Sequence, residues 1–358
     1  MDIIKLRNKI KENKIGYFFL YLFSILYIII FKINKIITES FFSKKFSIPI
    51  VCIGNISTGG TGKTSFVISL SKKLTDLKVN HSINMRGYKS KYGSKIIDSS
   101  VKNIIDDENC SDEQRLIVLA TKNKVPVIAS YKRVKAIKYI ISKHKPSLII
   151  MDDGFQNFKI KKDLNIVIIN LNSLYDHLLP LGNLRESYNS LKRADFVILN
   201  HCELFTEDKI EESISYLAQY ISTDKIIKAE YVLTGFMNLC DGNFYDVKKF
   251  IGKEVSVFCA IGDNNQFKYF LEKNQIKVTK FWYFNDHHRY TIGDLVSIKN
   301  LSSKNPILTT YKDAVKFLKY AKEIFDEIYV VDIAMKYNDD KIMERIKKLY
   351  ENNISKIK

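Results

Sequence analysis

Residues 50–64 read Ile-Val-Cys-Ile-Gly-Asn-Ile-Ser-Thr-Gly-Gly-Thr-Gly-Lys-Thr, and this stretch decides the fold. A short apolar run, Ile50–Gly54, leads into a glycine-rich loop, and a helical pattern follows over Thr64–Leu77. Glycines let backbone N–H groups turn inward around phosphate oxygens, and the N-terminus of a helix favours the anion. The pattern therefore predicts a phosphate-binding loop made of Ser57, Thr58, Gly59, Gly60, Thr61, Gly62, Lys63 and Thr64.

The last two residues of this loop are those that a nucleoside triphosphate site needs. Lys63 would contact the β and γ phosphates, and the hydroxyl of Thr64 would contact Mg²⁺. A GTP-binding protein of this kind would carry Asn-Lys-x-Asp after the strand candidate Phe196–Asn200, whereas this chain has Asn-His-Cys-Glu at residues 200–203. The missing lysine favours ATP as the nucleotide.

Two aspartates end another strand candidate. Asp152 and Asp153 follow the apolar run Ser147–Met151 and precede a glycine. A carboxylate in this position beside a phosphate loop would hold Mg²⁺. Without the loop, the same turn would be interpreted as a solvated strand end. The assignment of both residues to the metal, and of Asp152 to catalysis, therefore depends on the loop.

Two further segments are candidates for the reacting end of the site. Ser111–Gln114 opens an apolar helix as a capping box, with Asp112 and Glu113 in its first turn. Helix capping alone would explain these residues without any catalytic role. His287 follows the strand candidate Thr279–Phe284, where a surface histidine is usually solvated. Phosphoryl transfer to an alcohol requires a base near the hydroxyl, and Asp112 could orient His287 for that task.

Gly16–Phe31 is an uncharged apolar and aromatic stretch with lysines on both sides. As a helix it would be about 24 Å long, which is slightly short for crossing a bilayer. Lysines on both flanks fit a helix lying in the membrane interface as well as one that spans the membrane. A buried helix of a soluble protein is the third interpretation. No small-residue cleavage site follows, which disfavours a secretory signal.

Apolar strand candidates alternate with helical patterns through the rest of the chain. Such continuous Val and Ile runs indicate a parallel sheet covered on both faces. We expect an α/β fold with a P-loop NTPase-type parallel-sheet domain over residues 46–221, a second, smaller α/β domain over 222–358, and an N-terminal membrane-associating helix segment over 1–45. The strand candidates are Ile50–Gly54, Val125–Ala129, Ser147–Asp153, Leu164–Asn170, Phe196–Asn200, Lys228–Leu233, Val255–Ile261, Thr279–Phe284, Ile307–Thr310 and Ile328–Ile333.

The amino-acid composition excludes fewer classes of function than the motifs do. The 358 residues include 57 Lys and Arg against 39 Asp and Glu, which gives a formal net charge of +18. Such an excess fits nucleic acid, an anionic membrane surface or a phosphorylated substrate, and it also fits a compositional bias towards lysine. Five cysteines without a C-x-x-C pair indicate neither a disulfide framework nor a zinc ribbon, and they fit a reducing compartment.

Together these segments resemble one family, the tetraacyldisaccharide 4′-kinases of lipid A synthesis. The family's phosphate loop also begins with a hydroxyl residue, as it does here at Ser57. The matching residues, in chain order, are Gly54-Asn55, Arg86-Gly-Tyr88, Asp112-Glu113, Val125-Pro-Val127, Asp152-Asp-Gly-Phe-Gln156, Leu179-Pro180, Gly182, Leu184-Arg-Glu186, Arg193-Ala-Asp195, Ile261-Gly262, Phe284, Asp286-His287, Thr310 and Lys312-Asp-Ala-Val-Lys316.

The resemblance implies an enzyme that uses ATP and Mg²⁺ to phosphorylate the 4′-hydroxyl of a tetraacylated glucosamine disaccharide 1-phosphate, giving lipid IVA. It implies two α/β domains and an N-terminal membrane helix, at the cytoplasmic face of the bacterial inner membrane. It pairs Asp112 with His287 to activate the hydroxyl, and it puts Arg185 near the active site, where we expect it to bind substrate. The residues that it assigns to the metal and phosphates are Glu113, Asp152 and Asp153.

The chain departs from the family pattern at several loop positions. Asn157 replaces the histidine that follows Asp-Asp-Gly-x-Gln, so this position supplies no imidazole. Most of the other departures remove prolines, which changes the freedom of the unfolded chain more than the chemistry. These are Asn183 and Ser187 around Gly-x-Leu-Arg-Glu, Asn264 and Asn285, while Tyr311 replaces a glutamate.

The expected partners are the lipid disaccharide 1-phosphate and the anionic inner-membrane surface, without nucleic acid and without an obligate protein partner. A P-loop GTPase or metallochaperone-type switch protein is the alternative, and it would need a guanine motif or clustered Cys and His ligands. A nucleic-acid-dependent ATPase is the third hypothesis, and its mark would be DNA binding that persists at physiological salt.

Overall fold

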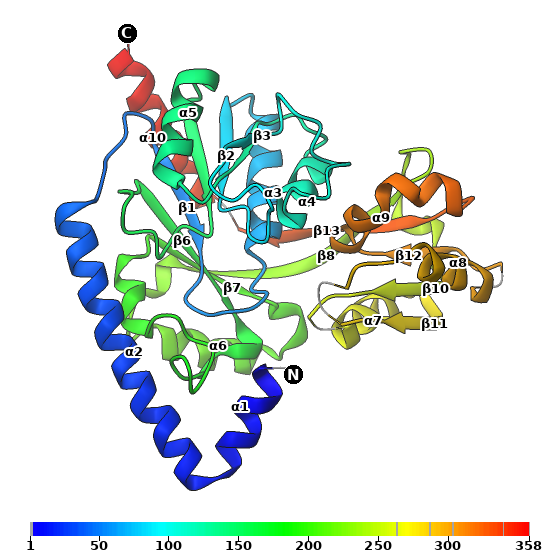
Figure 1. Ribbon diagram of the computed structural model, residues 1–358, viewed down its shortest axis with the longest axis horizontal. Coiled ribbons are helices and arrows are strands. Elements are labelled where there is room, and N and C mark those ends of the chain that lie inside the picture. The colour runs from blue at the N-terminus through cyan, green and yellow to red at the C-terminus, as the bar shows by residue number, and fades with distance from the viewer. Residues whose placement is uncertain (1–2, 263, 286–287, 303, 339, 358) are drawn as a thin grey trace.

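The computed structural model describes residues 3–357 except 263, 286, 287, 303 and 339. These residues form a larger and a smaller body side by side, with an N-terminal helical hairpin along the larger one (Figure 1). The helices are α1 Ile3–Glu12, α2 Lys14–Phe41, α3 Lys63–Asp76, α4 Asp112–Ala120, α5 Arg133–His144, α6 Glu207–Leu217, α7 Asn264–Lys273, α8 Ile292–Leu301, α9 Tyr311–Ile324 and α10 Asp340–Ile357.

One continuous sheet runs through both bodies in the order β11-β10-β12-β13-β8-β7-β6-β1-β5-β2-β4-β3, with β9 beside β8. The strands are β1 Ile50–Gly54, β2 His81–Met85, β3 Ile97–Asp98, β4 Val127–Ala129, β5 Leu148–Asp152, β6 Leu164–Asn170, β7 Phe196–Asn200, β8 Ile226–Asn238, β9 Phe244–Tyr245, β10 Glu254–Cys259, β11 Lys277–Tyr283, β12 Ile307–Thr309 and β13 Tyr329–Tyr337.

In the larger body, β1 lies between the parallel strands β5 and β6, and all of its residues are buried. Val51 and Ile53 pack in the same cluster as the buried face of α3, whereas Ile50 packs with α5 on the opposite face. Ile53 is in register with Asp152 of β5. The loop after β1 and the carboxylates at the end of β5 therefore meet at one edge of the sheet, as the sequence predicted.

Strand β2 was not predicted from the sequence, because its residues do not form an apolar run. His81 and Asn84 are both buried in this strand. Most of their polar atoms have partners: the Nε2 of His81 lies 2.8 Å from the Ser71 hydroxyl, and the Asn84 carboxamide oxygen accepts from Arg133 at 2.8 Å, whereas the Asn84 carboxamide nitrogen has no partner. Buried polar groups are tolerated when they are paired in this way.

Two long strands, β8 and β13, join the two bodies. The first residues of β8 pair with β7, and its remaining length pairs antiparallel with β13. Figure 1 shows the two strands crossing from one body to the other. The sequence predicted only part of each strand, Lys228–Leu233 within β8 and Ile328–Ile333 at the beginning of β13. The bodies are thus joined by a two-stranded ribbon.

The C-terminal helix α10 packs on the larger body, although it follows the smaller one in sequence. Ile342 and Ile346 are fully buried in the same cluster as Phe66 of α3. The domain boundary expected at residue 222 groups this helix with the smaller domain. An amphipathic pattern shows that one face of a helix is buried, but it does not reveal which core that face covers.

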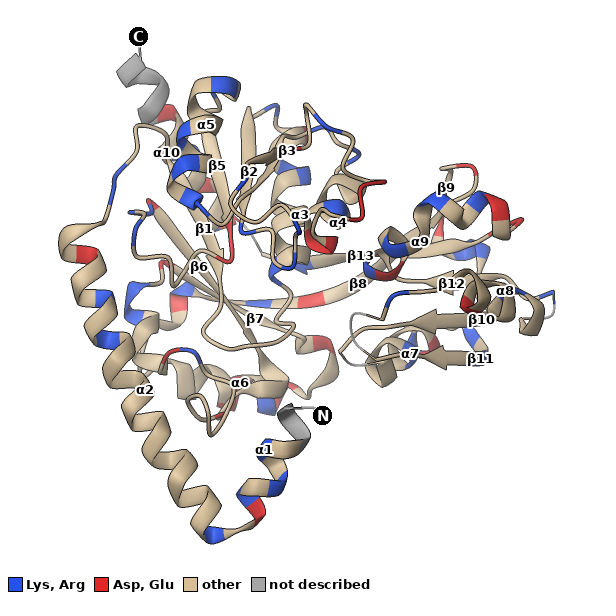
Figure 2. Cartoon of the chain, in the orientation of Figure 1, with Lys and Arg blue, Asp and Glu red and all other residues tan. Residues whose placement is uncertain are grey.

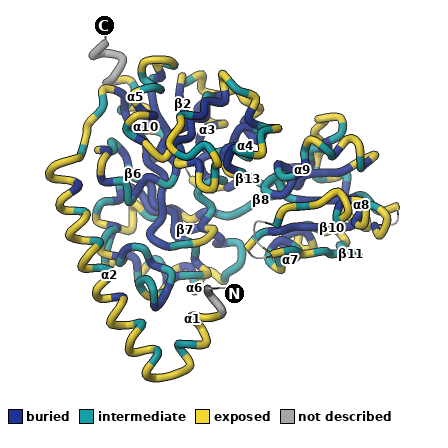
Figure 3. The backbone as a smooth tube through the Cα atoms, viewed as in Figure 1, coloured by how far each residue is buried: buried dark blue, intermediate teal, exposed yellow. Residues whose placement is uncertain are grey.

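The N-terminal helix α2 has 28 residues with a mean hydropathy of 2.0 over its most apolar window, of which only 6% is buried. Its buried residues are the polar Ser24 and Thr38, while most of its aromatic and aliphatic side chains are exposed (Figure 3). Lys14 begins the helix, and Lys32 and Lys35 lie in its C-terminal part (Figure 2). The third interpretation, a buried helix of a soluble protein, is therefore wrong.

Candidate functional site

The phosphate loop turns sharply into α3 at Gly62. This residue has φ 92°, which glycine adopts without strain. A Cβ here would lie 2.4 Å from the Nδ2 of Asn200 and 2.6 Å from the hydroxyl of Tyr231. Asn200 also donates a hydrogen bond to the carbonyl oxygen of Thr61 at 3.0 Å. Strands β7 and β8 thus support the loop from behind.

Three acidic side chains gather in front of Lys63. Asp152 ends β5, Asp153 follows with a left-handed backbone (φ 48°), and Glu113 lies in the first turn of α4. The Nζ of Lys63 is 3.5 Å from Asp153 Oδ1, and Arg185 reaches the same oxygen at 3.3 Å. The sequence-predicted residues Lys63, Asp153 and Arg185 therefore meet in one place.

The environment separates the pKa values of these acids. Burial, followed by the nearby charges of Glu113 and Asp153, raises the pKa of Asp152 to about 7. Burial also raises the pKa of Glu113 above its ordinary value. Burial acts in the same direction on Asp153, but Lys63 and Arg185 outweigh it and lower the pKa of that carboxyl. Opposite charges stabilise the ionised form, and desolvation disfavours it.

This acidic group fits a metal ion that is held together with a nucleotide. Asp152 Oδ1 is buried and has no hydrogen-bond partner, so it is an oxygen ready for a cation. Within the described residues, no three acidic, His or Cys side chains are spaced to hold a metal ion alone. Mg²⁺ in kinases needs only one or two carboxylates, because phosphate oxygens and water complete its shell. Thr64, in the first turn of α3, lies on the same loop.

Asp112 opens α4 directly before Glu113. Its side chain is 38% exposed and forms an ion pair with Arg115 at 3.9 Å. The predicted cap at Ser111 is present, with the Gln114 N–H donating to its hydroxyl at 3.2 Å. The reciprocal half of the capping box is absent, because the carboxamide of Gln114 donates instead to two strand carbonyls.

The proposed partner of Asp112, His287, lies outside the described residues. The next histidine, His288, is described, and its Nε2 is 3.2 Å from Asp294 Oδ2. Asp294 also accepts from the Thr291 backbone in the capping box of α8. His288 is therefore bound to the start of α8.

A basic cavity of about 390 Å³ lies between α2 and the loop edge of the larger sheet. Arg86, Arg133 and Arg185 line it, together with Asp153 and Asn157. Arg133 is buried and donates to the carbonyl oxygen of Asp152 at 2.6 Å. Arg133 was not predicted as a site residue, although it begins α5, the helix that follows β4, and thus comes from the same edge of the sheet.

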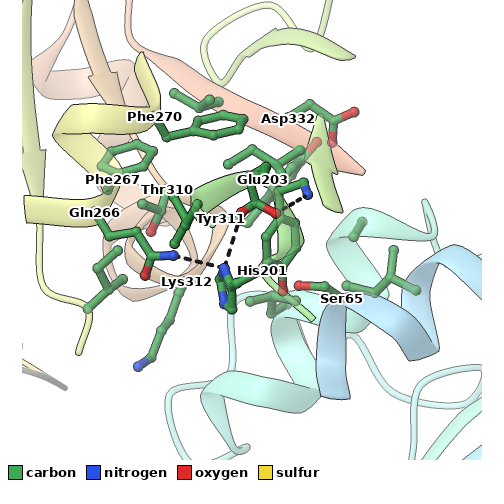
Figure 4. Close-up of a pocket in the computed structure, with 18 of the residues that line it drawn as sticks. Ser65, His201, Glu203, Gln266, Phe267, Phe270, Thr310, Tyr311, Lys312 and Asp332 are labelled. Carbon is green, nitrogen blue, oxygen red and sulfur yellow. Dashed lines mark hydrogen bonds and ion pairs between the residues drawn. The ribbon is translucent and has the colours of Figure 1, made fainter. Parts of the chain in front are cut away.

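A second cavity, of about 270 Å³, opens between the two bodies beside the start of α3 (Figure 4). Ser65, Tyr231, Phe267 and Phe270 contribute to its walls. His201 also faces it and lies 2.8 Å from the Gln266 carboxamide nitrogen. The segment that follows Asn200, which was compared with the guanine-recognition position, therefore lines this cavity.

Comparisons with known proteins agree with one another. The family model described as "Tetraacyldisaccharide-1-P 4'-kinase" matches residues 17–351. A tetraacyldisaccharide 4'-kinase of Elusimicrobium minutum is 33% identical over 95% of this chain and 93% of its own length. One of Aquifex aeolicus is 34% identical over 86% and 88%. A crystal structure of LpxK from Aquifex aeolicus in complex with ATP superposes with a TM-score of 0.74 at 28% identity, covering 93% of this chain and 99% of that one.

Proposed function

This chain belongs to the tetraacyldisaccharide 4′-kinase family, and from that membership we propose which residues perform each part of the reaction. The chain is a kinase of lipid A synthesis, which transfers the γ-phosphate of ATP to the 4′-hydroxyl of tetraacyldisaccharide 1-phosphate. ATP and Mg²⁺ are its cofactors. A GTPase or metallochaperone function is not favoured by these relatives.

We propose that Ser57–Thr64 cradle the triphosphate and that the base lies in the cavity between the two bodies. Ser65 directly follows the loop and lines this cavity, which supports continuity between the two places. The aromatic walls suit a planar base, and His201 and Glu203 supply polar groups at its edge. The smaller body thereby becomes part of the nucleotide site.

Thr64, Glu113, Asp152 and Asp153 are the residues that we propose around Mg²⁺. The unpartnered oxygen of Asp152 supports this assignment. When bound, the ion would neutralise charge on the phosphate oxygens. Lys63 would then donate to the phosphoryl group in transfer, which releases it from Asp153. We include Asp152 among the catalytic residues because its carboxyl lies close to the charges of Glu113, Asp153 and Lys63.

We propose that the basic cavity beside α2 binds the disaccharide, with the acyl chains along the apolar side of α2. The observation that carries this proposal is the chain of contacts Lys63–Asp153–Arg185, at 3.5 and 3.3 Å, because it joins the cavity to the phosphate loop. The guanidinium groups of Arg86, Arg133 and Arg185 suit a phosphorylated sugar.

The acceptor site is tested by replacing Arg86, which lines the cavity and is not part of the phosphate loop. Arg86→Gln should raise the KM for the lipid acceptor about tenfold and leave the KM for MgATP unchanged. The exposed Lys91, replaced in the same way, is the control for loss of one positive charge from the surface. An unchanged acceptor KM in Arg86→Gln would rule out this cavity.

For the proton of the 4′-hydroxyl, we propose the pair Asp112 and His287. The location of Asp112 beside Glu113 at the start of α4 supports its half of the pair. A histidine held by a carboxylate is a suitable base for an alcohol. Asn157 supplies an amide where the family pattern has a histidine, so we assign that position to the acceptor cavity that it lines and not to the metal.

We propose that the hairpin α1–α2 binds the anionic cytoplasmic surface of the inner membrane. An exposed apolar helix with lysines near its ends supports this location. The +18 charge then needs no nucleic acid, and no obligate protein partner is required. The membrane proposal predicts that the protein sediments with vesicles of anionic lipid and not with vesicles of purely zwitterionic lipid. DNA binding that persists at physiological salt would contradict the absence of a nucleic-acid partner.

We also propose a functional division of the chain. Residues 1–45 anchor it, residues 46–221 carry the phosphate loop and the acceptor cavity, and the part that begins at residue 222 closes the nucleotide site and carries the Asp-His motif. Helix α10 returns to support the larger body.

A further inference from the structure

The segment Leu178–Glu186, here called the bridging segment, lies between the N-terminal hairpin and the phosphate loop. On one side it contacts α2: the hydroxyl of Ser24 accepts from the N–H of Leu181 at 3.2 Å and shares its proton between the carbonyl oxygens of Leu178 at 3.1 Å and of Leu20, in its own helix, at 2.9 Å. One turn further along, the hydroxyl of Tyr27 donates to the carbonyl oxygen of Arg185 at 2.9 Å.

Helix α1 contacts the same segment from the other arm of the hairpin. The guanidinium of Arg7 donates to the carbonyl oxygen of Gly182 at 2.7 Å and to the side-chain oxygen of Asn183 at 3.0 Å. Asn183 stands where the family pattern has a proline, which has no side-chain acceptor. This chain therefore holds the bridging segment from both helices of the hairpin.

On its other side, the bridging segment pairs with the beginning of the phosphate loop. The N–H of Thr58 donates to the carbonyl oxygen of Asn183 at 2.7 Å, and the N–H of Arg185 donates to that of Ile56 at 2.7 Å. Ser57 and Leu184 form an antiparallel bridge between these bonds. The Arg185 side chain then reaches Asp153. One short segment thus fixes both the loop and the residue that joins it to the acceptor cavity.

The contacts on α2 are polar, although the helix is otherwise apolar. Ser24 is only 6% exposed and lies among side chains that mostly face outward. A hydroxyl buried against backbone groups stabilises one particular seating of a helix, because an apolar contact would tolerate sliding and rotation. The seating of the hairpin is therefore specific.

We propose that Arg7, Ser24 and Tyr27 are positioning residues that couple the seating of the N-terminal hairpin to the geometry of the phosphate loop. A hairpin seated at the membrane holds the bridging segment, and the segment holds Ser57, Thr58 and Arg185 in place for phosphoryl transfer. The proposal rests on the membrane location of the hairpin given above. It adds that the hairpin affects phosphoryl transfer in addition to holding the chain at the membrane.

The test removes hydroxyl groups without changing the apolar surface. The double variant Ser24→Ala/Tyr27→Phe loses the contacts of α2 with the bridging segment and keeps both hydrocarbon frameworks. Tyr21→Phe is the matched control, since Tyr21 is an exposed tyrosine of the same helix. Full-length proteins are compared in anionic vesicles for sedimentation, for MgATP affinity without acceptor, and for kcat and KM.

The double variant should sediment with vesicles as the wild type does, bind MgATP three- to tenfold more weakly and show a lower kcat. Tyr21→Phe should match the wild type in all three measurements. Arg7→Gln, which acts from the other helix, should weaken MgATP binding in the same way, and Arg7→Lys should recover part of the loss. This graded recovery would not be expected if the residues served only to keep the chain folded.

Two results would overturn the coupling. The first is that the double variant has the MgATP affinity and kcat of the wild type. The second is that the double variant no longer sediments with vesicles, that this loss fully accounts for its lower activity, and that Arg7→Gln binds MgATP as the wild type does. Failure of the membrane location itself is distinguishable, because then the wild-type protein would not sediment with vesicles.

Discussion

The Nδ2 of Asn200 donates a hydrogen bond to the carbonyl oxygen of Thr61 at 3.0 Å, from the end of β7 to the middle of the phosphate loop. Asn200 lies at the position that was compared with guanine recognition, and the structure gives its side chain a different task. The same nitrogen is 3.3 Å from the hydroxyl of Tyr231. The residues that follow Asn200 line the cavity in which we propose that the base lies.

Replacing Asn200 should weaken nucleotide binding. Asn200→Ala removes the buried hydrogen bond to the loop, and such a loss costs about 1–2 kcal/mol, which corresponds to roughly 5- to 30-fold in MgATP affinity. The affinity is measured by titration without acceptor. Asn172→Ala, at an exposed position of the short 3-10 helix after β6, should leave it unchanged. Wild-type affinity in Asn200→Ala would mean that the loop holds its shape without this contact.

A methyl group at Gly62 should abolish nucleotide binding. Gly62→Ala strains the backbone at φ 92° and pushes against Asn200 and Tyr231 at under 3 Å. Gly293→Ala is the control, because a Cβ there meets its nearest neighbour only at 3.7 Å and the residue lies within a helix. Thermal unfolding should show both variants folded, with MgATP binding lost only in Gly62→Ala. Retained binding in that variant would contradict the account of the loop.

The affinity for MgATP should rise with pH between 6 and 8. The pKa of Asp152 is raised to about 7, and Mg²⁺ competes with the proton for this carboxylate. For one proton, the affinity at pH 6 is about tenfold lower than at pH 8. Titration across this range checks the slope, and an affinity that does not change with pH would remove Asp152 from the metal site.

The same carboxyl should destabilise the ligand-free protein at high pH. Its folded pKa lies above the unfolded value of 3.8, so the cost to the free energy of unfolding grows as the pH rises from about 4 to 7 and then stays constant. Asp152→Asn should therefore stabilise the protein at pH 8, by at most about 4 kcal/mol, and have little effect at pH 4.

Asp153→Asn is the matched control, with the opposite sign. The pKa of Asp153 is lowered despite its burial, because Lys63 and Arg185 favour the ionised form. Its ionisation thus contributes stability above the unfolded pKa, and this contribution is lost as the pH falls. Chemical denaturation at pH 8 should show Asp153→Asn less stable and Asp152→Asn more stable than the wild type. Equal effects of both changes would contradict the separation of the two pKa values.

The proposed base is tested by a double-mutant cycle. If Asp112 acts through His287, then Asp112→Ala and His287→Ala should each lower kcat by about 10²–10⁴, and the double variant should be little worse than the poorer single one. The KM for MgATP should stay close to the wild-type value. Normal transfer by either single variant would exclude the pair.

The sequence predicted the parts of the structure that depend on local chemistry. The bounds of β1, β6 and β7 agree with the expected runs, because continuous apolar stretches between turns are unambiguous. The phosphate loop was predicted from its glycine-rich motif. Asp152 and Asp153 were predicted beside it because parallel strands bring their carboxyl ends to the same edge of the sheet.

The sequence could not predict what long-range packing decides. β2 was missed because its buried His81 and Asn84 depend on Ser71 and Arg133, contacts that lie outside the strand and that no local pattern reveals. The basic cavity also depends on contacts between segments that are far apart in sequence. The contact of Arg7 with Asn183 spans 176 positions, and no local pattern reveals it.

The central claim is tested most directly by following labelled phosphate into lipid. Purified protein is incubated with Mg²⁺, ATP labelled at the γ-phosphate and tetraacyldisaccharide 1-phosphate, and the lipids are separated by thin-layer chromatography. We predict a labelled disaccharide that carries a second phosphate at the 4′ position, formed by the wild type and nearly lost in Lys63→Ala. The absence of labelled lipid, in a preparation that binds MgATP, would contradict the account.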